Sequence, residues 1–118
     1  MKTLVIGASE NEERYANMAV RSLLKHNHEV VAIGKRNGQI AGINIDTGSP
    51  EYNDVDTVTV YLNPSNQKAL YDYILNLKPR RIIFNPGAEN PELERLATDK
   101  GIEVEEACSL VLLSIGAY

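Results

Sequence analysis

TLVIGAS, residues 3–9, is the stretch that decides the fold, and the segment from Glu10 to Leu24 follows it. An apolar run ends in a small-residue turn, and the apolar residues beyond the turn recur at helical spacing, which predicts a strand, a tight loop and a helix. Gly7 has no Cβ, so a ligand can approach closely where the strand ends. Ser9 adds a hydroxyl, and the free N–H groups and dipole of the helix suit a phosphate there. A plain strand-to-helix turn is the alternative.

The composition indicates one soluble globular domain spanning residues 1–118, with 43% hydrophobic and 24% charged residues. Its net charge of −4 gives no general attraction to nucleic acid or acidic membranes, so a bound anion needs a local arrangement. The single cysteine, Cys108, excludes an internal disulfide and a multi-cysteine metal site. No apolar run reaches membrane-spanning length and no signal peptide precedes the first strand, so we expect a cytoplasmic protein.

Strands and helices alternate along the chain. Strands are expected at Thr3–Gly7, Glu29–Ile33, Asp56–Leu62, Arg81–Phe84 and Ile102–Glu105. The stretch from 38 to 54 is rich in Gly, Asn, Asp and Pro, and it is predicted to be an irregular connection with at most a short edge strand. The alternation predicts a three-layer, doubly wound α/β fold around a mostly parallel, five-stranded sheet.

The helix starts have their own signals. The first helix is expected near Tyr15, because the residues from Glu10 to Arg14 are all polar and form a loop. Asn63-Pro64 and Asn90-Pro91 each place a capping residue before a proline, which favours a helix start. The apolar tail from 108 to 115 is predicted to be helical.

Three unusual loops are expected to meet at the carboxyl ends of the strands, where doubly wound folds bind ligands. They are Gly7, Ala8 and Ser9; Gly34, Lys35 and Arg36; and Asn85, Pro86, Gly87 and Ala88. Lys35 and Arg36 stand where a dinucleotide-binding domain uses an acid to hold the ribose of NAD. Two cations disfavour NAD and favour an extra phosphate on the adenosine ribose, as in NADP or coenzyme A. A solvated turn is the structural alternative for this basic pair.

Several segments together resemble the small stand-alone CoA-binding domain family, which is related to the nucleotide-binding domain of the succinyl-CoA synthetase α subunit. The resemblance covers nearly the whole chain and rests on residues 5–9, on Arg14-Tyr15-Ala16-Asn17, on the strand entering Gly34-Lys35, and on the run from Phe84 to Glu89. The Asn-Pro-Gly-Ala-Glu run before a capped helix is the most specific of these segments. The chain departs from the family at the end of the second strand, where an Asn-Pro pair is usual.

The resemblance implies a Rossmann-like domain that holds coenzyme A. The diphosphate would lie near the Gly-Ala-Ser turn, with Arg14 reaching the phosphates, and the 3′-phosphate would lie near Lys35 and Arg36. Leu62, Asn63 and Pro64 would border the adenine or the pantetheine arm. Tyr15 and Tyr61 are candidates for stacking on adenine, with ordinary strand or core packing as the alternative for each.

No catalytic or metal-binding set is recognisable in the sequence. Cys108 follows the last strand and has two possible roles. It could form a disulfide with the thiol of coenzyme A, or it could simply pack the terminal helix. We expect non-catalytic binding of coenzyme A or an acyl-CoA. An NADP-binding redox or sensor module and an accessory subunit of an acyl-CoA ligase are the alternatives. The expected partner is a small-molecule nucleotide rather than nucleic acid or membrane, and a homodimer or an unknown protein partner stays open.

Overall fold

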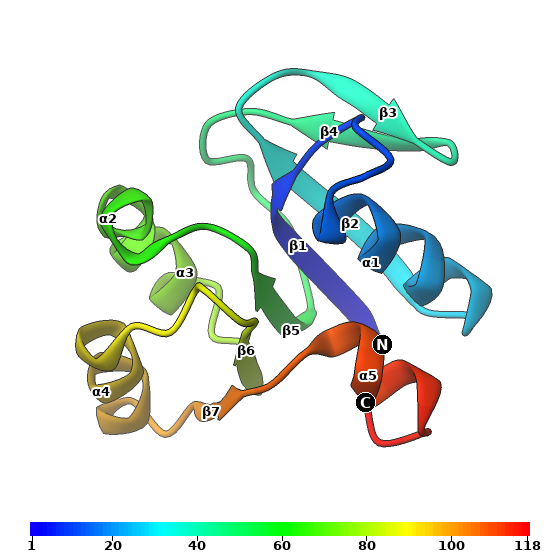
Figure 1. Ribbon diagram of the computed structural model, residues 1–118. Coiled ribbons are helices and arrows are strands. Elements are labelled where there is room, and N and C mark those ends of the chain that lie inside the picture. Colours follow the sequence, from blue (N-terminus) through cyan, green and yellow to red (C-terminus); the bar gives the residue numbers. More distant parts are fainter.

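A seven-stranded sheet with helices on both faces makes up the computed structural model, which describes residues 1–118 (Figure 1). The strands are β1 (Lys2–Ala8), β2 (Glu29–Gly34), β3 (Gly38–Ile40), β4 (Ile43–Asp46), β5 (Val55–Val60), β6 (Arg81–Phe84) and β7 (Glu103–Glu106). The helices are α1 (Tyr15–Lys25), α2 (Pro64–Gln67), α3 (Tyr71–Asn76), α4 (Pro91–Asp99) and α5 (Ser109–Ser114), with a 3₁₀ turn, η1 (Lys68–Leu70), between α2 and α3. None of these helices combines the length and apolar character that a membrane crossing requires.

The central strand of the sheet is β1. The strand order is β3-β4-β2-β1-β5-β6-β7. All neighbouring strands are parallel except β3 and β4, which are antiparallel. The chain leaves β1 toward β2 and β4, and it then returns to the opposite side of β1 as β5. The mostly parallel, doubly wound arrangement is therefore confirmed, and the direction of winding reverses at β1.

The predicted number of five strands is wrong, because the connection after residue 38 contains two more. β3 and β4 form a hairpin at the edge beyond β2 (Figure 1). Its two-residue turn, Ala41 and Gly42, has φ angles of 49° and 86°. Such turns are usually signalled by Asn-Gly or Asp-Gly, and Ala-Gly lacks that signal. Strands of three and four residues are also too short to show a clear alternation.

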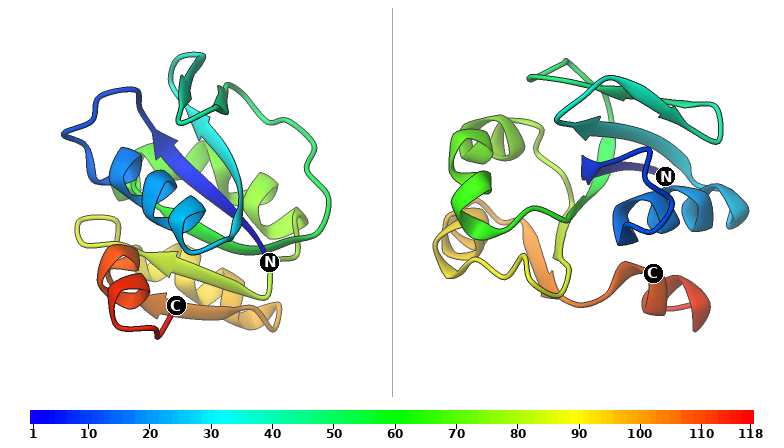
Figure 2. Two further views of the ribbon diagram at one scale, coloured as in Figure 1. Left: turned by 90° about the vertical axis from the view of Figure 1, so that its right-hand side faces the viewer. Right: turned by 45° about the horizontal axis from the view of Figure 1, so that its top comes forward.

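Two hydrophobic cores fill the two faces of the sheet. α1 and α5 cover one face, and α2, α3 and α4 cover the other (Figures 1 and 2). Leu4 and Ile6 of β1 belong to the core under α3 and α4, whereas Val5 and Ala8 belong to the core under α1 and α5. Because both faces of β1 are covered, the strand is apolar without alternation, as its sequence indicated.

The predicted helix starts are confirmed. α1 begins at Tyr15. Asn63 and Asn90 cap α2 and α4, and each side-chain oxygen accepts a hydrogen bond from a backbone N–H three residues on, at 3.1 and 3.2 Å. The terminal apolar segment forms α5. In contrast, the helix after Asn63 is not continuous, because η1 interrupts it before α3.

Gln67 at the end of α2 is fully buried and connects three segments. Its amide nitrogen donates to the carbonyl oxygens of Leu62 and Ala88, both at 2.8 Å. Its amide oxygen accepts from the Asn90 side chain at 2.9 Å. These bonds hold α2 against the ends of β5 and β6. A buried polar side chain of this kind gives no periodic signal in the sequence.

Candidate functional site

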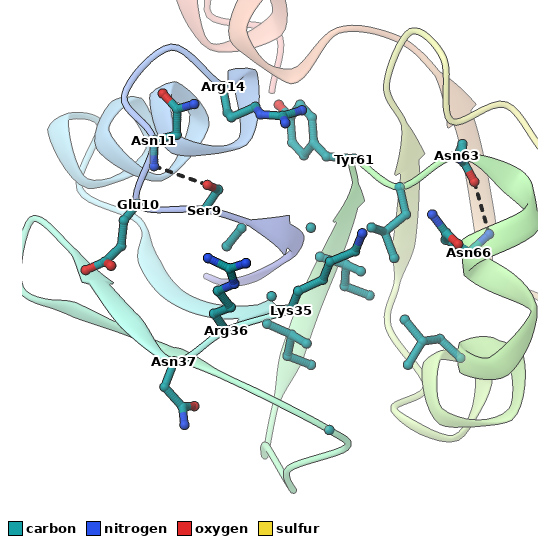
Figure 3. A pocket seen from close by; sticks show the side chains of 18 residues that line it. Ser9, Glu10, Asn11, Arg14, Lys35, Arg36, Asn37, Tyr61, Asn63 and Asn66 are labelled. Atoms are coloured by element: carbon teal, nitrogen blue, oxygen red, sulfur yellow. Dashed lines mark hydrogen bonds between the residues drawn. The ribbon is translucent and has the colours of Figure 1, made fainter.

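A cleft of about 930 Å³ opens at the carboxyl ends of β1, β2 and β5 (Figure 3). This is the place where the winding of the sheet reverses around β1, and ligands of doubly wound folds bind at such places. Its lining residues are Ile6, Gly7, Ala8, Ser9, Glu10, Asn11, Arg14, Ile33, Gly34, Lys35, Arg36, Asn37, Gly48, Tyr61, Leu62, Asn63, Asn66 and Leu70. The first two of the three predicted loops therefore meet here.

Two glycines allow the backbone to approach closely at the floor of the cleft. Gly7 has a φ of 96°, and a Cβ on it would lie 3.2 Å from the backbone carbon of Tyr61. Gly34 pairs with Ala8, and a Cβ on Gly34 would lie only 2.3 Å from the Ala8 carbonyl oxygen. β1 and β2 can end side by side only because position 34 lacks a side chain. At these two positions the floor of the cleft is thus formed by backbone alone.

The β1 loop, defined here as residues 7–14, is held by its own hydrogen bonds. The Ser9 hydroxyl oxygen accepts from the Asn11 backbone N–H at 3.1 Å, and the Asn11 carbonyl oxygen accepts from the Arg14 N–H at 3.0 Å. The buried Asn17 side chain of α1 donates to the Ser9 carbonyl oxygen at 2.9 Å. These bonds fix the path of the loop across the start of α1.

Three cationic side chains, Arg14, Lys35 and Arg36, line the cleft without an anionic partner. The ion pairs of the protein involve Lys2, Arg21, Arg80 and Arg81 and none of these three. Arg36 extends toward Ser9, and Arg14 extends toward Tyr61 (Figure 3). Unpaired cations concentrated in one cleft attract anions even though the whole chain carries a net charge of −4.

The wall opposite the basic residues comes from the segment after β5. Leu62 and Leu70 supply apolar surface, and Asn63 and Asn66 supply amides. The Asn63 side-chain oxygen is occupied, because it accepts from the Asn66 N–H at 3.1 Å and from the Ser65 hydroxyl at 2.8 Å. A mixed wall of this kind suits a flat, partly apolar group with polar edges.

Glu10 is a lining residue that the sequence interpretation missed. Its Oε2 accepts a hydrogen bond from the Gln39 backbone N–H of β3 at 3.0 Å. Gly38 leaves room for this contact, since a Cβ there would lie 2.5 Å from the Glu10 carboxyl carbon. The two bonded residues are far apart in the chain, and β3 itself was not predicted, so no local pattern could reveal the contact.

Tyr61, the second candidate for stacking on adenine, lines the cleft, and its hydroxyl is buried without a hydrogen-bond partner. Burial raises the pKa of the Tyr61 phenol, so the group stays protonated. Cys108 is half-buried at the start of α5 and does not line the cleft. The remaining lining residues absent from the predicted set are Ile6, Asn11, Ile33, Asn37, Gly48, Asn66 and Leu70.

The other predicted site residues lie outside the cleft lining. Tyr15 is 69% exposed on α1, and Pro64 is exposed at the first position of α2. Asn85, Pro86, Gly87 and Ala88 belong to the β6 loop, defined here as residues 85–89, which does not line the cleft either.

Asn85 turns its side chain into the protein. Its amide nitrogen donates to the Thr59 hydroxyl at 2.7 Å and to the Val60 carbonyl oxygen at 3.0 Å. Its amide oxygen accepts from the Ser109 backbone N–H at 2.8 Å. Asn85, in the most specific run of the sequence, thus joins the start of α5 to β5.

Comparisons with known proteins show the family of the chain and several solved structures of the same fold. A family model described as a CoA binding domain matches residues 1–114. A solved structure of an uncharacterized protein is 47% identical, with a TM-score of 0.96 and coverage of 99% of this chain and 97% of that chain.

More distant solved structures share the Rossmann-like mixed α/β fold. One from Thermus thermophilus is 21% identical, with a TM-score of 0.86 and coverage of 99% of this chain and 90% of that chain. A conserved hypothetical protein from Pyrococcus furiosus is 24% identical, with a TM-score of 0.75 and coverage of 88% and 90%. No curated protein matches the chain.

Proposed function

The chain belongs to the CoA binding domain family, and from this premise we propose that its cleft binds coenzyme A or an acyl-CoA without catalysing a reaction on it. The observation that carries the proposal is the group of three unpaired cations in one cleft of an acidic protein. Coenzyme A carries a diphosphate and a separate 3′-phosphate, so it needs cationic donors in more than one place. The arrangement of Arg14 apart from Lys35 and Arg36 meets that need.

The diphosphate is assigned to the turn formed by Gly7, Ala8 and Ser9. Gly7 lines the cleft with backbone alone, and the start of α1 directs N–H groups toward the loop. No side chain caps α1, so a bound anion does not compete with a protein group there. Arg14, at the cap position of α1, is within the same lining and would add a charge-assisted bond.

The 3′-phosphate is assigned to Lys35 and Arg36 at the end of β2. Leu62 and Asn63 are assigned to the adenine or the start of the pantetheine arm, with Pro64 just beyond the cleft wall. Coenzyme A would supply a thiol that carries acyl groups, and the protein would supply binding and orientation. The β6 loop makes no contribution to the assigned contacts.

An NADP-binding module is a second candidate, and Lys35 and Arg36 are the observation that favours it. A 2′-phosphate on the adenosine ribose of NADP would need cations at the same end of β2. The two candidates differ in where the ribose phosphate is attached, so they can be separated by comparing ligands.

The test is a calorimetric titration with coenzyme A, dephospho-CoA, NADP and NAD under reducing conditions. The double variant Lys35→Ala with Arg36→Ala should weaken coenzyme A roughly ten- to a hundredfold, because a charge-assisted bond contributes about 1.5–3 kcal/mol. Dephospho-CoA lacks the 3′-phosphate, so its affinity should change much less.

A matched control removes two cations outside the cleft, Lys25→Ala with Lys100→Ala, which alters the net charge equally. Equal losses for coenzyme A and dephospho-CoA, or equal losses in both double variants, would contradict the assignment to Lys35 and Arg36. No binding of coenzyme A by the wild type would contradict the proposed function itself.

A further inference from the structure

A carboxylate and two cations lie along the same cleft without neutralising one another. Glu10, Lys35 and Arg36 all line it. No ion pair within 4.0 Å joins Glu10 to either cation, although the protein forms such pairs elsewhere. Figure 3 shows the Glu10 carboxylate directed toward β3, whereas the Arg36 guanidinium is directed toward Ser9. The cleft therefore keeps both signs of charge available to a ligand.

Glu10 is held in place by the edge hairpin. The Gln39 N–H donates to Oε2 at 3.0 Å, and position 38 lacks the side chain that would displace the carboxyl group. Gln39 pairs with Asn44 in the β3–β4 ladder, so the donor belongs to an ordered strand. Oε1 has no protein donor among the hydrogen bonds of the structure, and it can accept a bond from a ligand hydroxyl.

The position of this carboxylate has a chemical counterpart in dinucleotide-binding domains. There, an acid at the end of the second strand accepts a hydrogen bond from the ribose 2′-hydroxyl. This chain has Lys35 and Arg36 at that point of the sequence, but the fold brings a carboxylate to the connection just after them from another segment. Glu10 and the basic pair therefore line the same cleft from two different segments of the chain.

We infer that Glu10 selects an adenosine ribose with a free 2′-hydroxyl and a 3′-phosphate, and that it rejects a 2′-phosphate. The inference rests on the proposed binding of coenzyme A in this cleft. A 2′-hydroxyl donates to the carboxylate, while the neighbouring 3′-phosphate is held by Lys35 and Arg36. A 2′-phosphate is mostly dianionic at neutral pH, so it seldom has a proton to donate and is repelled by the carboxylate. Glu10 would thus be the residue that separates coenzyme A from NADP.

Two isomeric probes isolate this effect, adenosine 3′,5′-bisphosphate and adenosine 2′,5′-bisphosphate. They share the same base, sugar and charge, so general electrostatic attraction is equal for both. The wild type should bind the 3′,5′ isomer at least about tenfold more tightly, which corresponds to about 1.4 kcal/mol.

In the variant Glu10→Gln, this preference should shrink about tenfold, mainly through tighter binding of the 2′,5′ isomer, because like-charge repulsion is removed. The amide oxygen of glutamine can still accept from Gln39, so the loop should keep its path. Unchanged thermal unfolding would verify that it does.

Glu12→Gln is the matched control, because Glu12 lies in the same loop, pairs with Arg21 at 3.3 Å and does not line the cleft. It should leave the isomer preference as in the wild type. The inference alone is overturned if the wild type binds coenzyme A but Glu10→Gln changes both isomers equally, or if Glu12→Gln has the same effect. If the wild type binds neither isomer and no coenzyme A, the proposed function fails and the inference fails with it.

Discussion

The β1 loop and the β6 loop share a Gly-Ala pair but lie in different surroundings, since only the β1 loop lines the cleft. Both follow a buried parallel strand, and both precede a helix. In the β1 loop, Arg14 has no side-chain partner and the backbone at Gly7 is open to the cleft. In the β6 loop, both the amide nitrogen and the amide oxygen of the Asn85 side chain form hydrogen bonds within the protein, and the Ala88 carbonyl oxygen accepts from Gln67.

This difference teaches how to separate a binding loop from a structural loop at the ligand end of a sheet. A loop can bind a ligand when its polar groups remain unpaired and reach a cleft. It becomes part of the scaffold when those groups bond to neighbouring segments. The effects of substitutions should follow the same division, with changes in stability at the β6 loop and changes in affinity at the β1 loop.

The largest expected effect is on stability, for Asn85→Ala. The variant removes three buried hydrogen bonds and leaves the Ser109 N–H without its partner, so the free energy of unfolding should fall by about 3 kcal/mol. Urea denaturation measures it, and coenzyme A affinity of the folded fraction should stay the same. Asn11→Ala in the β1 loop is the control, because Asn11 is exposed. A loss no larger than that of the control would break the comparison.

The second-largest effect is expected for Gly34→Ala, which should lower both the stability of the protein and its affinity for coenzyme A. The added Cβ would meet the Ala8 carbonyl oxygen at 2.3 Å, so β1 and β2 must separate, at a cost of about 2 kcal/mol. Coenzyme A affinity should fall as well, because the floor of the cleft moves. The control, for stability alone, is Gly38→Ala, where the nearest atoms to the added Cβ all belong to the Glu10 side chain, which can move. Equal unfolding midpoints for the two variants would contradict this account.

Arg14→Ala should change affinity without changing stability. Its side chain makes no ion pair, so the free energy of unfolding should stay within about 0.5 kcal/mol of the wild type. Coenzyme A should bind about tenfold more weakly, through the loss of one charge-assisted bond. Calorimetric titration beside Arg95→Ala, a substitution on α4 outside the cleft, tests this expectation. An affinity equal to that of the control variant would remove Arg14 from the proposed site.

The smallest expected effect is a pH dependence of stability that comes from Glu94 on α4. Burial, and then the neighbouring Glu106, raise the pKa of the Glu94 carboxyl above its ordinary value of 4.5. The folded state therefore favours the protonated form, so this contribution to stability is complete below the unfolded-state pKa and is lost as pH rises through the folded-state pKa.

Glu94→Gln removes that loss. At neutral pH the free energy of unfolding of the variant should exceed that of the wild type by about 0.5 kcal/mol. The difference should close toward pH 4.5, as thermal unfolding at a series of pH values would show. A gap that widens in acid would contradict the assignment. Coenzyme A affinity should be unaffected, in contrast to every change that moves the β1 loop or its cations.

Local patterns explain which parts could be predicted. The buried strands, the start of α1 at Tyr15 and the caps at Asn63 and Asn90 follow from periodicity and from the chemistry of helix ends, which act within a few residues. The gathering of the β1 loop with Lys35 and Arg36 follows from the rule that parallel strands end at one edge. Nine of the predicted site residues and the candidate Tyr61 accordingly line the cleft.

The sequence by itself determined the α/β class, the buried first strand with its Gly-Ala-Ser turn, and the basic pair at the end of β2, because those features depend on neighbouring residues. Only the tertiary structure decided that Asn85 faces inward, that Gln67 joins the ends of β5 and β6, and that Glu10 reaches β3. Each of these outcomes depends on a hydrogen bond between segments far apart in the chain. A polar side chain bonds to whichever partner the fold brings near it, and no local pattern specifies that partner.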